Sequence, residues 1–288
     1  MRLYNTDQGP AREDEPGILT VVDLPDLGEV LREGGLDRVI RSAPAVDKVQ
    51  LADARLYAPV RRPGKVIVVG LNYASHAQEA LEWFAAMGMP EIELPNVPNF
   101  YLAAASAVTG PGSTIRLPQA APAQVDYEGE VAVVIGRDGA DISTSDAWDH
   151  VAGLTIANDV SARDVQQRAM AGDPTATVAT AKSFDTFKPL GPCLVTSDEF
   201  GEPLDLRIRT RVNDELRQDG RSSGFIHRIP DLIAYLSRFH ALQAGDVICT
   251  GTPAGAGLFS ERFLAPGDVV EVEVERIGVL TNPVTAGS

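Results

Sequence analysis

The sequence contains few cysteines, few positive charges and no long hydrophobic run. Its two cysteines, Cys193 and Cys249, form neither a disulfide framework nor a metal-binding pair, which agrees with a reducing compartment. With 25 Lys and Arg against 40 Asp and Glu, the net charge of −15 disfavours nucleic acid and anionic membranes as partners. No apolar stretch is long enough to cross a bilayer, and residues 1–17 lack the apolar core of a signal peptide. We therefore expect a cytoplasmic protein.

Short apolar runs typical of β-strands dominate what is present. Hydrophobic residues make up 44% of the 288 residues, enough for a substantial core. Turn-forming RRPGK (61–65) interrupts the pattern, which predicts a small N-terminal domain over 1–62 and a larger domain over 63–288. The larger domain has apolar runs at 66–70, 130–136, 154–159, 190–196, 206–213, 246–251 and 269–277. Since they do not alternate regularly with helices, the sequence predicts an α+β, mainly β fold.

Two helices and one hairpin complete this pattern. Residues 230–242 begin with a proline suited to a first helical turn, and apolar residues recur at helical spacing at Leu232, Ile233, Leu236 and Phe239. Residues 77–87 predict a second helix. Residues 207–220 alternate around Asn213 and Asp214, which is typical of a β-hairpin.

Two glutamates lie two positions apart at the start of an apolar run, in VDYEGEVAVVIG. Glu128 and Glu130 point to the same side of a strand, where their charges repel. If both are buried, a divalent cation keeps both ionised. A hard cation such as Mg²⁺ or Mn²⁺ suits such oxygen ligands, and Asp159, at the end of GLTIAND, fits as the third. The alternative is that the pair lies on the solvated face of an edge strand.

A histidine and a glutamate lie at helical spacing in GLNYASHAQEA. His76 and Glu79 are separated by three positions, so on a helix the carboxylate can orient the imidazole and stabilise its charged form. The spacing is that of a water-activating pair. The alternative is a surface or capping histidine.

Seven segments, in order, resemble motifs of the fumarylacetoacetate hydrolase family, in its acylpyruvase or 2-hydroxyhepta-2,4-diene-1,7-dioate isomerase-like branch. They are GLNYASHAQEA, VDYEGEVAVVIGRDG, GLTIANDVSARDVQ, AKSFDTFKPLGP, VNDELRQDG, GTPAG and GDVVEVEVERIG, covering about residues 55 to 284. The resemblance implies a mixed β-sandwich roll, a homodimer, and Mg²⁺ or Mn²⁺ held by Glu128, Glu130 and Asp159.

The resemblance also implies roles for other residues. His76 and Glu79 lie on a lid over the metal and activate water. Lys182, in AKSFDTF, lies in the active site, where it stabilises developing negative charge. The substrate is then contacted by Gln166, Thr252 and Tyr73.

These parts predict a metal-dependent hydrolase that cleaves a carbon–carbon bond of a β-diketone or acylpyruvate-like 2,4-dioxo acid, through activated water and a metal-stabilised enolate. The same parts serve a decarboxylase or an isomerase or tautomerase of 2-oxo acids such as oxaloacetate or 2-hydroxyhepta-2,4-dienedioate. Further alternatives are a metal-stabilised binding module and a metal-independent hydrolase that uses Ser222 of GRSSG, although polar LRQDG precedes that motif instead of the buried strand it requires.

The sequence departs from the family pattern at two places near the expected site. Ala103 stands where many relatives carry a lysine, and WFAAMGMPEIELP (83–95) lengthens the expected lid. The loss of a cation and the added apolar residues predict a substrate that is bulkier or less anionic than simple acylpyruvates.

Overall fold

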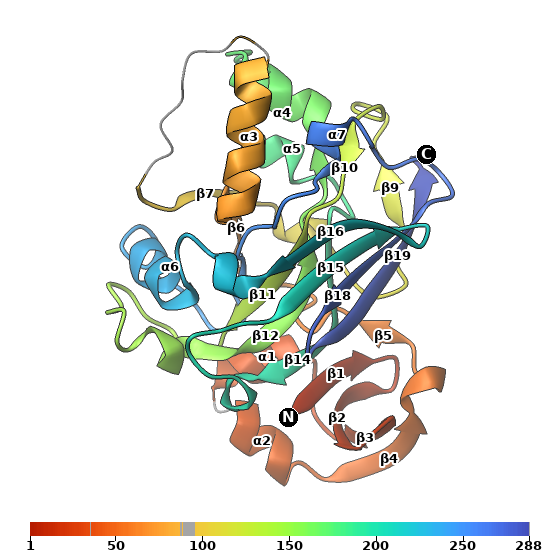
Figure 1. The fold of residues 1–288 in the computed structure, drawn as a ribbon. Helices are drawn as coiled ribbons and strands as arrows, with labels where there is room; N and C mark the ends of the chain where they lie inside the picture. Colours follow the sequence, from red (N-terminus) through yellow and green to blue (C-terminus); the bar gives the residue numbers. More distant parts are fainter. Residues whose placement is uncertain (35, 87, 89–95, 288) are drawn as a thin grey trace.

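The computed structural model describes residues 1–34, 36–86, 88 and 96–287. Its large mixed sheet has the order β4-β3-β2-β1-β14-β12-β11-β17-β6-β7, and a second sheet, β16-β15-β18-β19-β9, packs on β11, β12 and β14 (Figure 1). The predicted α+β, mainly β sandwich roll is confirmed. No helix among these residues is long and apolar enough to span a bilayer.

The large sheet and its two short side strands comprise β1 Arg2–Thr6, β2 Gly9–Glu15, β3 Ile18–Val22, β4 Ala45–Gln50, β5 Leu56–Tyr57, β6 Val66–Gly70, β7 Asn99–Ala103, β8 Val108–Thr109, β11 Gly129–Ile135, β12 Val151–Asn158, β14 Lys188–Thr196 and β17 Val247–Cys249. The second sheet comprises β9 Ile115–Leu117, β15 Arg207–Val212, β16 Glu215–Arg221, β18 Val269–Val274 and β19 Gly278–Ala286. A separate small pair is formed by β10 Val125–Asp126 and β13 Ser161–Ala162. The helices are α1 Leu27–Glu33, α2 Leu36–Ser42, α3 Ala74–Ala86, α4 Arg163–Met170, α5 Val178–Ala181, α6 Ile229–Leu236 and α7 Gly257–Ser260.

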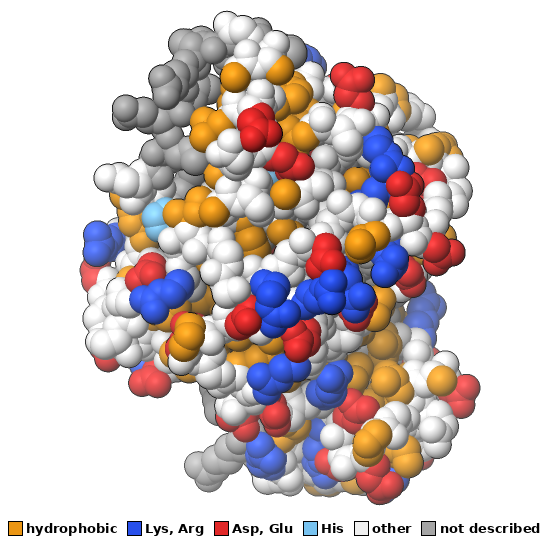
Figure 2. All heavy atoms as spheres, viewed as in Figure 1, with side chains coloured by type: hydrophobic (Ala, Val, Ile, Leu, Met, Phe, Trp, Pro, Cys, Tyr) orange, Lys and Arg blue, Asp and Glu red, His pale blue; other side chains and the backbone are white. Residues whose placement is uncertain are grey.

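All seven predicted strands are present, with bounds that differ by a few residues. The predicted hairpin is confirmed as β15 and β16, and its turn residues Asn213 and Asp214 adopt positive φ angles of 51° and 64°. The exposed side of this sheet carries basic and acidic side chains, among them Arg207, Arg209 and Glu273. Figure 2 shows blue and red side chains next to one another in this part of the surface. This face is therefore a mixed-charge surface.

The predicted helix over 230–242 is wrong in its C-terminal half, because α6 ends at Leu236. The next residue, Ser237, accepts hydrogen bonds from the segment beside it: its hydroxyl from the backbone of Ile142, and its carbonyl from the backbone of Asp141. Leu242 then pairs with Gly139. These contacts redirect the chain. The predicted helix over 77–87 is observed as α3 up to Ala86, and residue 87 lies outside the described residues.

The N-terminal residues continue the large sheet. Strand β1 pairs antiparallel with β14, with Leu3 opposite Leu194. A hydrophobic cluster contains Leu3 and Leu27 together with Ala132 and Leu194, so it contains residues from both sides of the predicted boundary. The division into domains 1–62 and 63–288 stays a prediction.

Strands β11 and β12 run antiparallel through the middle of the large sheet, with Gly129 opposite Asn158. Just beyond this pair, the backbone N–H of Asp159 donates to the carbonyl of Glu128 at 2.8 Å. Gly129 is needed here, because a Cβ at this position would lie 2.1 Å from the hydroxyl of Thr210 in the second sheet. The close approach of the two sheets fixes this end of β11.

Candidate active site

Three buried carboxylates meet at the ends of β11 and β12. Glu128, Glu130 and Asp159 each offer a ligand atom, and these atoms lie within 4.8 Å of one another. All three side chains are buried, so the alternative of a solvated strand face does not describe them. The strand geometry expected from the E-x-E spacing therefore leads to a candidate metal centre.

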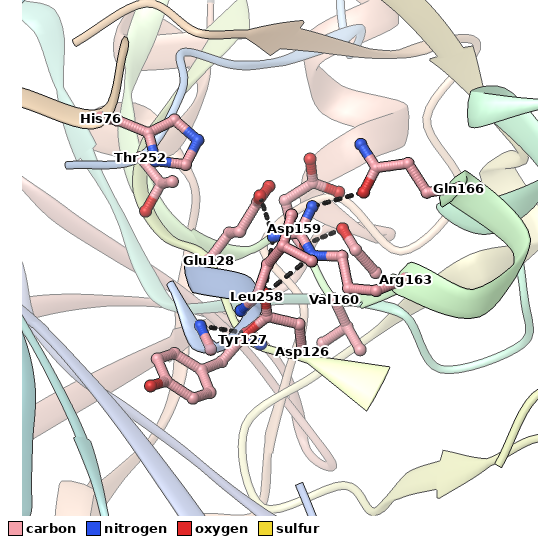
Figure 3. A network of polar contacts seen from close by, with 12 residues as sticks. His76, Asp126, Tyr127, Glu128, Asp159, Val160, Arg163, Gln166, Thr252 and Leu258 are labelled. Carbon is pink, nitrogen blue, oxygen red and sulfur yellow. Dashed lines mark hydrogen bonds and ion pairs between the residues drawn. The ribbon is translucent and has the colours of Figure 1, made fainter. Parts of the chain in front are cut away.

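Three buried cations surround this cluster. Lys182, directly after α5, places its Nζ 2.7 Å from Glu128 and 2.6 Å from Asp159. Lys188 on β14 lies 2.6 Å from the other oxygen of Asp159. Arg163 on α4 donates to Glu128 at 2.5 Å and to Asp126 at 2.7 Å (Figure 3). Each ammonium or guanidinium group offsets carboxylate charge that burial would otherwise disfavour.

The two glutamates respond in opposite ways to these surroundings. Burial raises the pKa of Glu128, but the charges of Lys182 and Arg163 outweigh burial and hold this pKa below its usual range. Burial raises the pKa of Glu130, and the negative charges of Asp159 and Glu128 raise it further. In the metal-free protein Glu130 therefore holds a proton more readily than Glu128 does.

The residues present fit a divalent cation. Asp159 Oδ1 is buried and has no hydrogen-bond partner, because its contact with Lys188 is an ion pair outside hydrogen-bonding geometry. A divalent cation at the cluster would supply the missing partner and would also replace the proton of Glu130. Oxygen-only donors of this kind suit Mg²⁺ or Mn²⁺.

A cavity of about 180 Å³ opens beside the cluster. Four of the residues predicted for catalysis and binding line it together with Glu128, namely His76, Lys182, Gln166 and Thr252. The remaining wall is largely apolar and includes Ala80, Trp83, Phe84, Met170, Leu258 and Phe259. The structure thus brings the imidazole of His76, the ammonium group of Lys182 and one candidate metal ligand, Glu128, to one cavity.

His76 and Glu79 lie on the first turns of α3, as the spacing predicts. His76 Nδ1 is 3.7 Å from the Glu79 carboxylate and has no hydrogen-bond partner, although it is buried. Both Glu79 oxygens accept from the backbone N–H of Gly255 at 3.0 Å, which fixes the carboxylate. The His76 ring packs edge-on against Phe259, with ring centroids 5.4 Å apart. The imidazole is held at the cavity wall, with its Nδ1 on the side of the Glu79 carboxylate.

The three predicted substrate contacts differ in position. Gln166 lines the cavity, and its carbonyl oxygen accepts from Arg163 at 2.6 Å. The hydroxyl of Thr252 donates to the carbonyl of Gly129 at 2.9 Å and accepts from Gln218 at 2.8 Å. Tyr73 is buried against Phe225 and is not among the residues that line this cavity. Their roles toward a substrate stay predictions.

Ser222 lies at a different cavity, beside Leu204 and Phe225. Its hydroxyl accepts from the backbone of Leu206 at 2.8 Å and donates to the carbonyl of Leu204 at 3.2 Å. These hydrogen bonds are those of a turn residue.

The lid expected over 83–95 is described only for residues 83–86 and 88, and the rest of that prediction lies outside the described residues.

Sequence reasoning missed Lys188, Arg163 and Asp126. Lys188 is fully buried within β14, and a lysine next to an otherwise apolar strand was the signal that could have found it. Arg163 and Asp126 gave no such signal, because their partnership joins segments 37 residues apart. Ala103 removes the positive charge that many relatives carry at this position. The described cluster still has a nearby cation, because Lys188 pairs with Asp159.

Comparison with known proteins shows the family of this chain. Residues 65–285 match the model of the fumarylacetoacetate (FAA) hydrolase C-terminal domain. The chain therefore belongs to the fumarylacetoacetate hydrolase family, a family of enzymes.

Among its relatives is the oxaloacetate tautomerase YisK of Bacillus subtilis, which is 42% identical over 237 residues, or 81% of this chain and 74% of that protein. A solved structure, the 5-carboxymethyl-2-hydroxymuconate delta-isomerase of Mycobacterium smegmatis, is 35% identical with a TM-score of 0.76, over 99% of this chain and 100% of that one. A second, the maleylpyruvate hydrolase of Sphingobium sp. SYK-6 with manganese(II) and pyruvate, is 26% identical with a TM-score of 0.77, over the full length of both chains. The family thus includes tautomerases, isomerases and hydrolases, and one of these neighbours binds manganese.

Proposed function

We propose that this protein is a metal-dependent tautomerase that interconverts the keto and enol forms of a 2-oxo acid. His76 supports this function, because its imidazole lines the cavity together with Glu128 and Lys182, while its Nδ1 lies 3.7 Å from the Glu79 carboxylate. Tautomerisation needs one proton to move between carbon and oxygen, and one well-placed acid–base group can move it. The relatives named as oxaloacetate tautomerases support the same reaction class.

The reaction conserves all atoms and electrons. In the enol direction the C3–H bond breaks and its electron pair becomes the C2–C3 double bond, while the π bond of the C2 carbonyl breaks and its pair stays on the oxygen, which takes a proton back from His76. His76 accepts the proton from C3, and Glu79, fixed by Gly255, orients the imidazole and stabilises its charged form. Lys182 faces the negative charge that develops on the C2 oxygen. A cation held by Glu128, Glu130 and Asp159 would act as a Lewis acid on the oxygens of the 2-oxo acid.

The test is tautomerisation of oxaloacetate, followed by the loss of enol absorbance, with Mn²⁺ or Mg²⁺ and with EDTA. We expect His76→Ala to lower kcat by about a hundredfold or more, as removal of a general base does. His240→Ala is the matched control, because His240 packs on Phe100 and does not line this cavity. Full tautomerase activity in His76→Ala, or no effect of EDTA, would refute the proposal.

Carbon–carbon bond hydrolysis is the second candidate. The fixed carboxylate of Glu79 behind His76 favours it, since a histidine held by a carboxylate can take a proton from water. The similarity to a maleylpyruvate hydrolase supports it as well. Release of pyruvate from acylpyruvates by the wild type, lost in both His76→Ala and Glu79→Gln, would assign hydrolysis to this pair. The cytoplasmic location and the homodimer stay predictions.

A further inference from the structure

The walls of the cavity define what the far end of the substrate can be. Helix α3 contributes Ala80, Trp83 and Phe84 beside His76, and its sequence, ASHAQEALEWFAA, contains no lysine or arginine. Helix α7 contributes Leu258 and Phe259 and also lacks a cation. The aromatic rings of this wall pack on one another, with Trp83 and Phe84 centroids 5.4 Å apart. This wall offers a ligand apolar surface and no positive charge.

Only two cations, Arg163 and Lys182, line the cavity within the described part of the chain. Every nitrogen group of Arg163 is occupied, by Asp126, Glu128 and Gln166. Lys182 makes three hydrogen bonds, to Glu128, Asp159 and Ser161. Both cations are therefore committed to the end of the cavity that holds the carboxylate cluster.

The polar groups elsewhere on the wall are neutral. Asn99 and Tyr101 on β7 bond to each other at 3.1 Å, and Gln167 is a further uncharged lining residue. A second carboxylate on the substrate would lose water here without gaining a charged partner, which disfavours its binding strongly. An apolar group would instead displace water from the aromatic wall, which favours binding.

We infer that the substrate is a 2-oxo acid whose substituent on C3 is uncharged and apolar, such as an aryl or branched alkyl group. This inference rests on the proposed tautomerase function and specifies its substrate class. The acid end of the molecule lies at the carboxylate cluster with Lys182. The substituent packs between α3 and α7, against Trp83, Phe84, Leu258 and Phe259. Oxaloacetate, with a carboxylate as that substituent, is then a poor substrate for this chain.

The experiment compares kcat/KM for enol–keto interconversion of phenylpyruvate and of oxaloacetate, with Mn²⁺, in the same buffer. We expect phenylpyruvate to be favoured by about tenfold or more, the scale on which a pocket discriminates between side chains. If oxaloacetate is turned over at least as efficiently, the inference is wrong and the tautomerase function stands. If neither compound is tautomerised, the proposed function fails and the inference falls with it.

A cation placed in the wall provides an independent test. Met170 lines the cavity at the end of α4 and is 48% exposed, so Met170→Lys is expected to fold. We expect this variant to shift the ratio of the two kcat/KM values about tenfold toward oxaloacetate, by supplying the missing partner charge. Met170→Gln, similar in length but neutral, is the matched control, and Trp83→Arg is a second variant at the other wall. An unchanged ratio in both charged variants would overturn the inference.

Discussion

Glu128 and Glu130 lie two residues apart, yet their pKa values move in opposite directions. Lys182 and Arg163 contact Glu128 directly, whereas Glu130 accepts one backbone N–H, from Gly251 at 2.8 Å, and faces the negative charges of its neighbours. A carboxyl group whose pKa is raised on folding stabilises the protein while it is protonated. That stability is lost as the pH rises through the raised pKa. A bound metal ion removes this loss, because it takes the place of the proton.

The first prediction is that stabilisation by metal increases with pH. At a Mn²⁺ concentration a hundredfold above Kd, we expect the free energy of unfolding to rise by about 2.7 kcal/mol. Because Glu130 must lose its proton to bind the ion, this gain should shrink as the pH falls through the raised pKa of Glu130 toward the ordinary pKa of a glutamate, about 4.3. Thermal unfolding with and without Mn²⁺ at several pH values measures it. Glu130→Gln should lose the metal-induced gain, and a gain independent of pH in the wild type would contradict the prediction.

Lys188 carries a charge in the interior of β14. Its Nζ lies 2.6 Å from Asp159 and donates to the carbonyl oxygens of Lys182 at 2.5 Å and of Phe187 at 3.0 Å. It thus joins the end of the Lys182 segment to a candidate metal ligand. Its removal leaves a buried carboxylate and three carbonyl groups, those of Val160, Lys182 and Phe187, without this partner.

The second prediction is therefore a large loss of stability in Lys188→Met. We expect the free energy of unfolding, measured by urea titration without metal, to fall by about 3–5 kcal/mol, as when one partner of a buried ion pair is removed. Excess Mn²⁺ should recover part of this loss, because the cation again compensates the charge of Asp159. Lys48→Met, which breaks the exposed pair with Glu15, is the control and should change stability by less than about 1 kcal/mol. Equal losses in the two variants would show that burial of Lys188 adds nothing.

At the scale of elements, Asp126 connects α4, α7 and the metal centre. One of its oxygens accepts from the backbone N–H groups of Gly257 at 2.7 Å and Tyr127 at 2.8 Å. The other accepts from Leu258 at 3.0 Å and from Arg163 at 2.7 Å (Figure 3). Arg163 also holds Glu128. The carboxylate of Asp126 therefore fixes a candidate metal ligand, through Arg163, and also α7, which carries part of the apolar wall of the cavity.

The third prediction concerns Asp126→Asn. The variant loses the negative charge that pairs with Arg163. Its amide nitrogen, itself a donor, replaces one of the two oxygens that accept from N–H groups. Helix α7 and Glu128 then lose the side chain that supports both of them. We expect kcat/KM for the tautomerised 2-oxo acid to fall about tenfold or more, together with a lower thermal midpoint. Asp146→Asn, in an exposed turn with Ser143, is the control. Wild-type kinetics in Asp126→Asn would show that Arg163 and α7 hold their positions without it.

Elements were predictable from sequence where local pattern alone determines them. Strands such as β6 and β11 follow from short apolar runs, and the side chains of Glu128 and Glu130 meet because a strand alternates its faces. The end of α6 was not predictable, since bonds from the segment around Asp141 stop it at Leu236. In the site, the cations Lys188 and Arg163 could not be paired with carboxylates by spacing, because tertiary packing brings separate elements together there.

At the scale of the whole molecule, the first strand is part of the main sheet. Leu3 on β1 is fully buried in one cluster with Leu194 of β14 and Ala132 of β11. Strand β11 begins directly after Glu128. A side chain near the N-terminus is thereby packed against the strands that position the candidate metal centre.

The fourth prediction is that the chain unfolds in one cooperative transition, because one hydrophobic cluster contains residues of the N-terminal strands and of the sheet that carries the site. We expect Leu3→Ala to lower the free energy of unfolding by about 2–5 kcal/mol, as large-to-small changes in a packed core do. It should shift far-ultraviolet circular dichroism and tryptophan fluorescence together, since Trp83 and Trp148 lie outside the N-terminal unit. Val46→Ala, on β4 and 60% exposed, is the control and should change stability little. If Leu3→Ala instead produces an early transition that leaves the tryptophan signal in place, the N-terminal residues fold as an independent domain, and their packing on β14 does not couple them to the catalytic sheet.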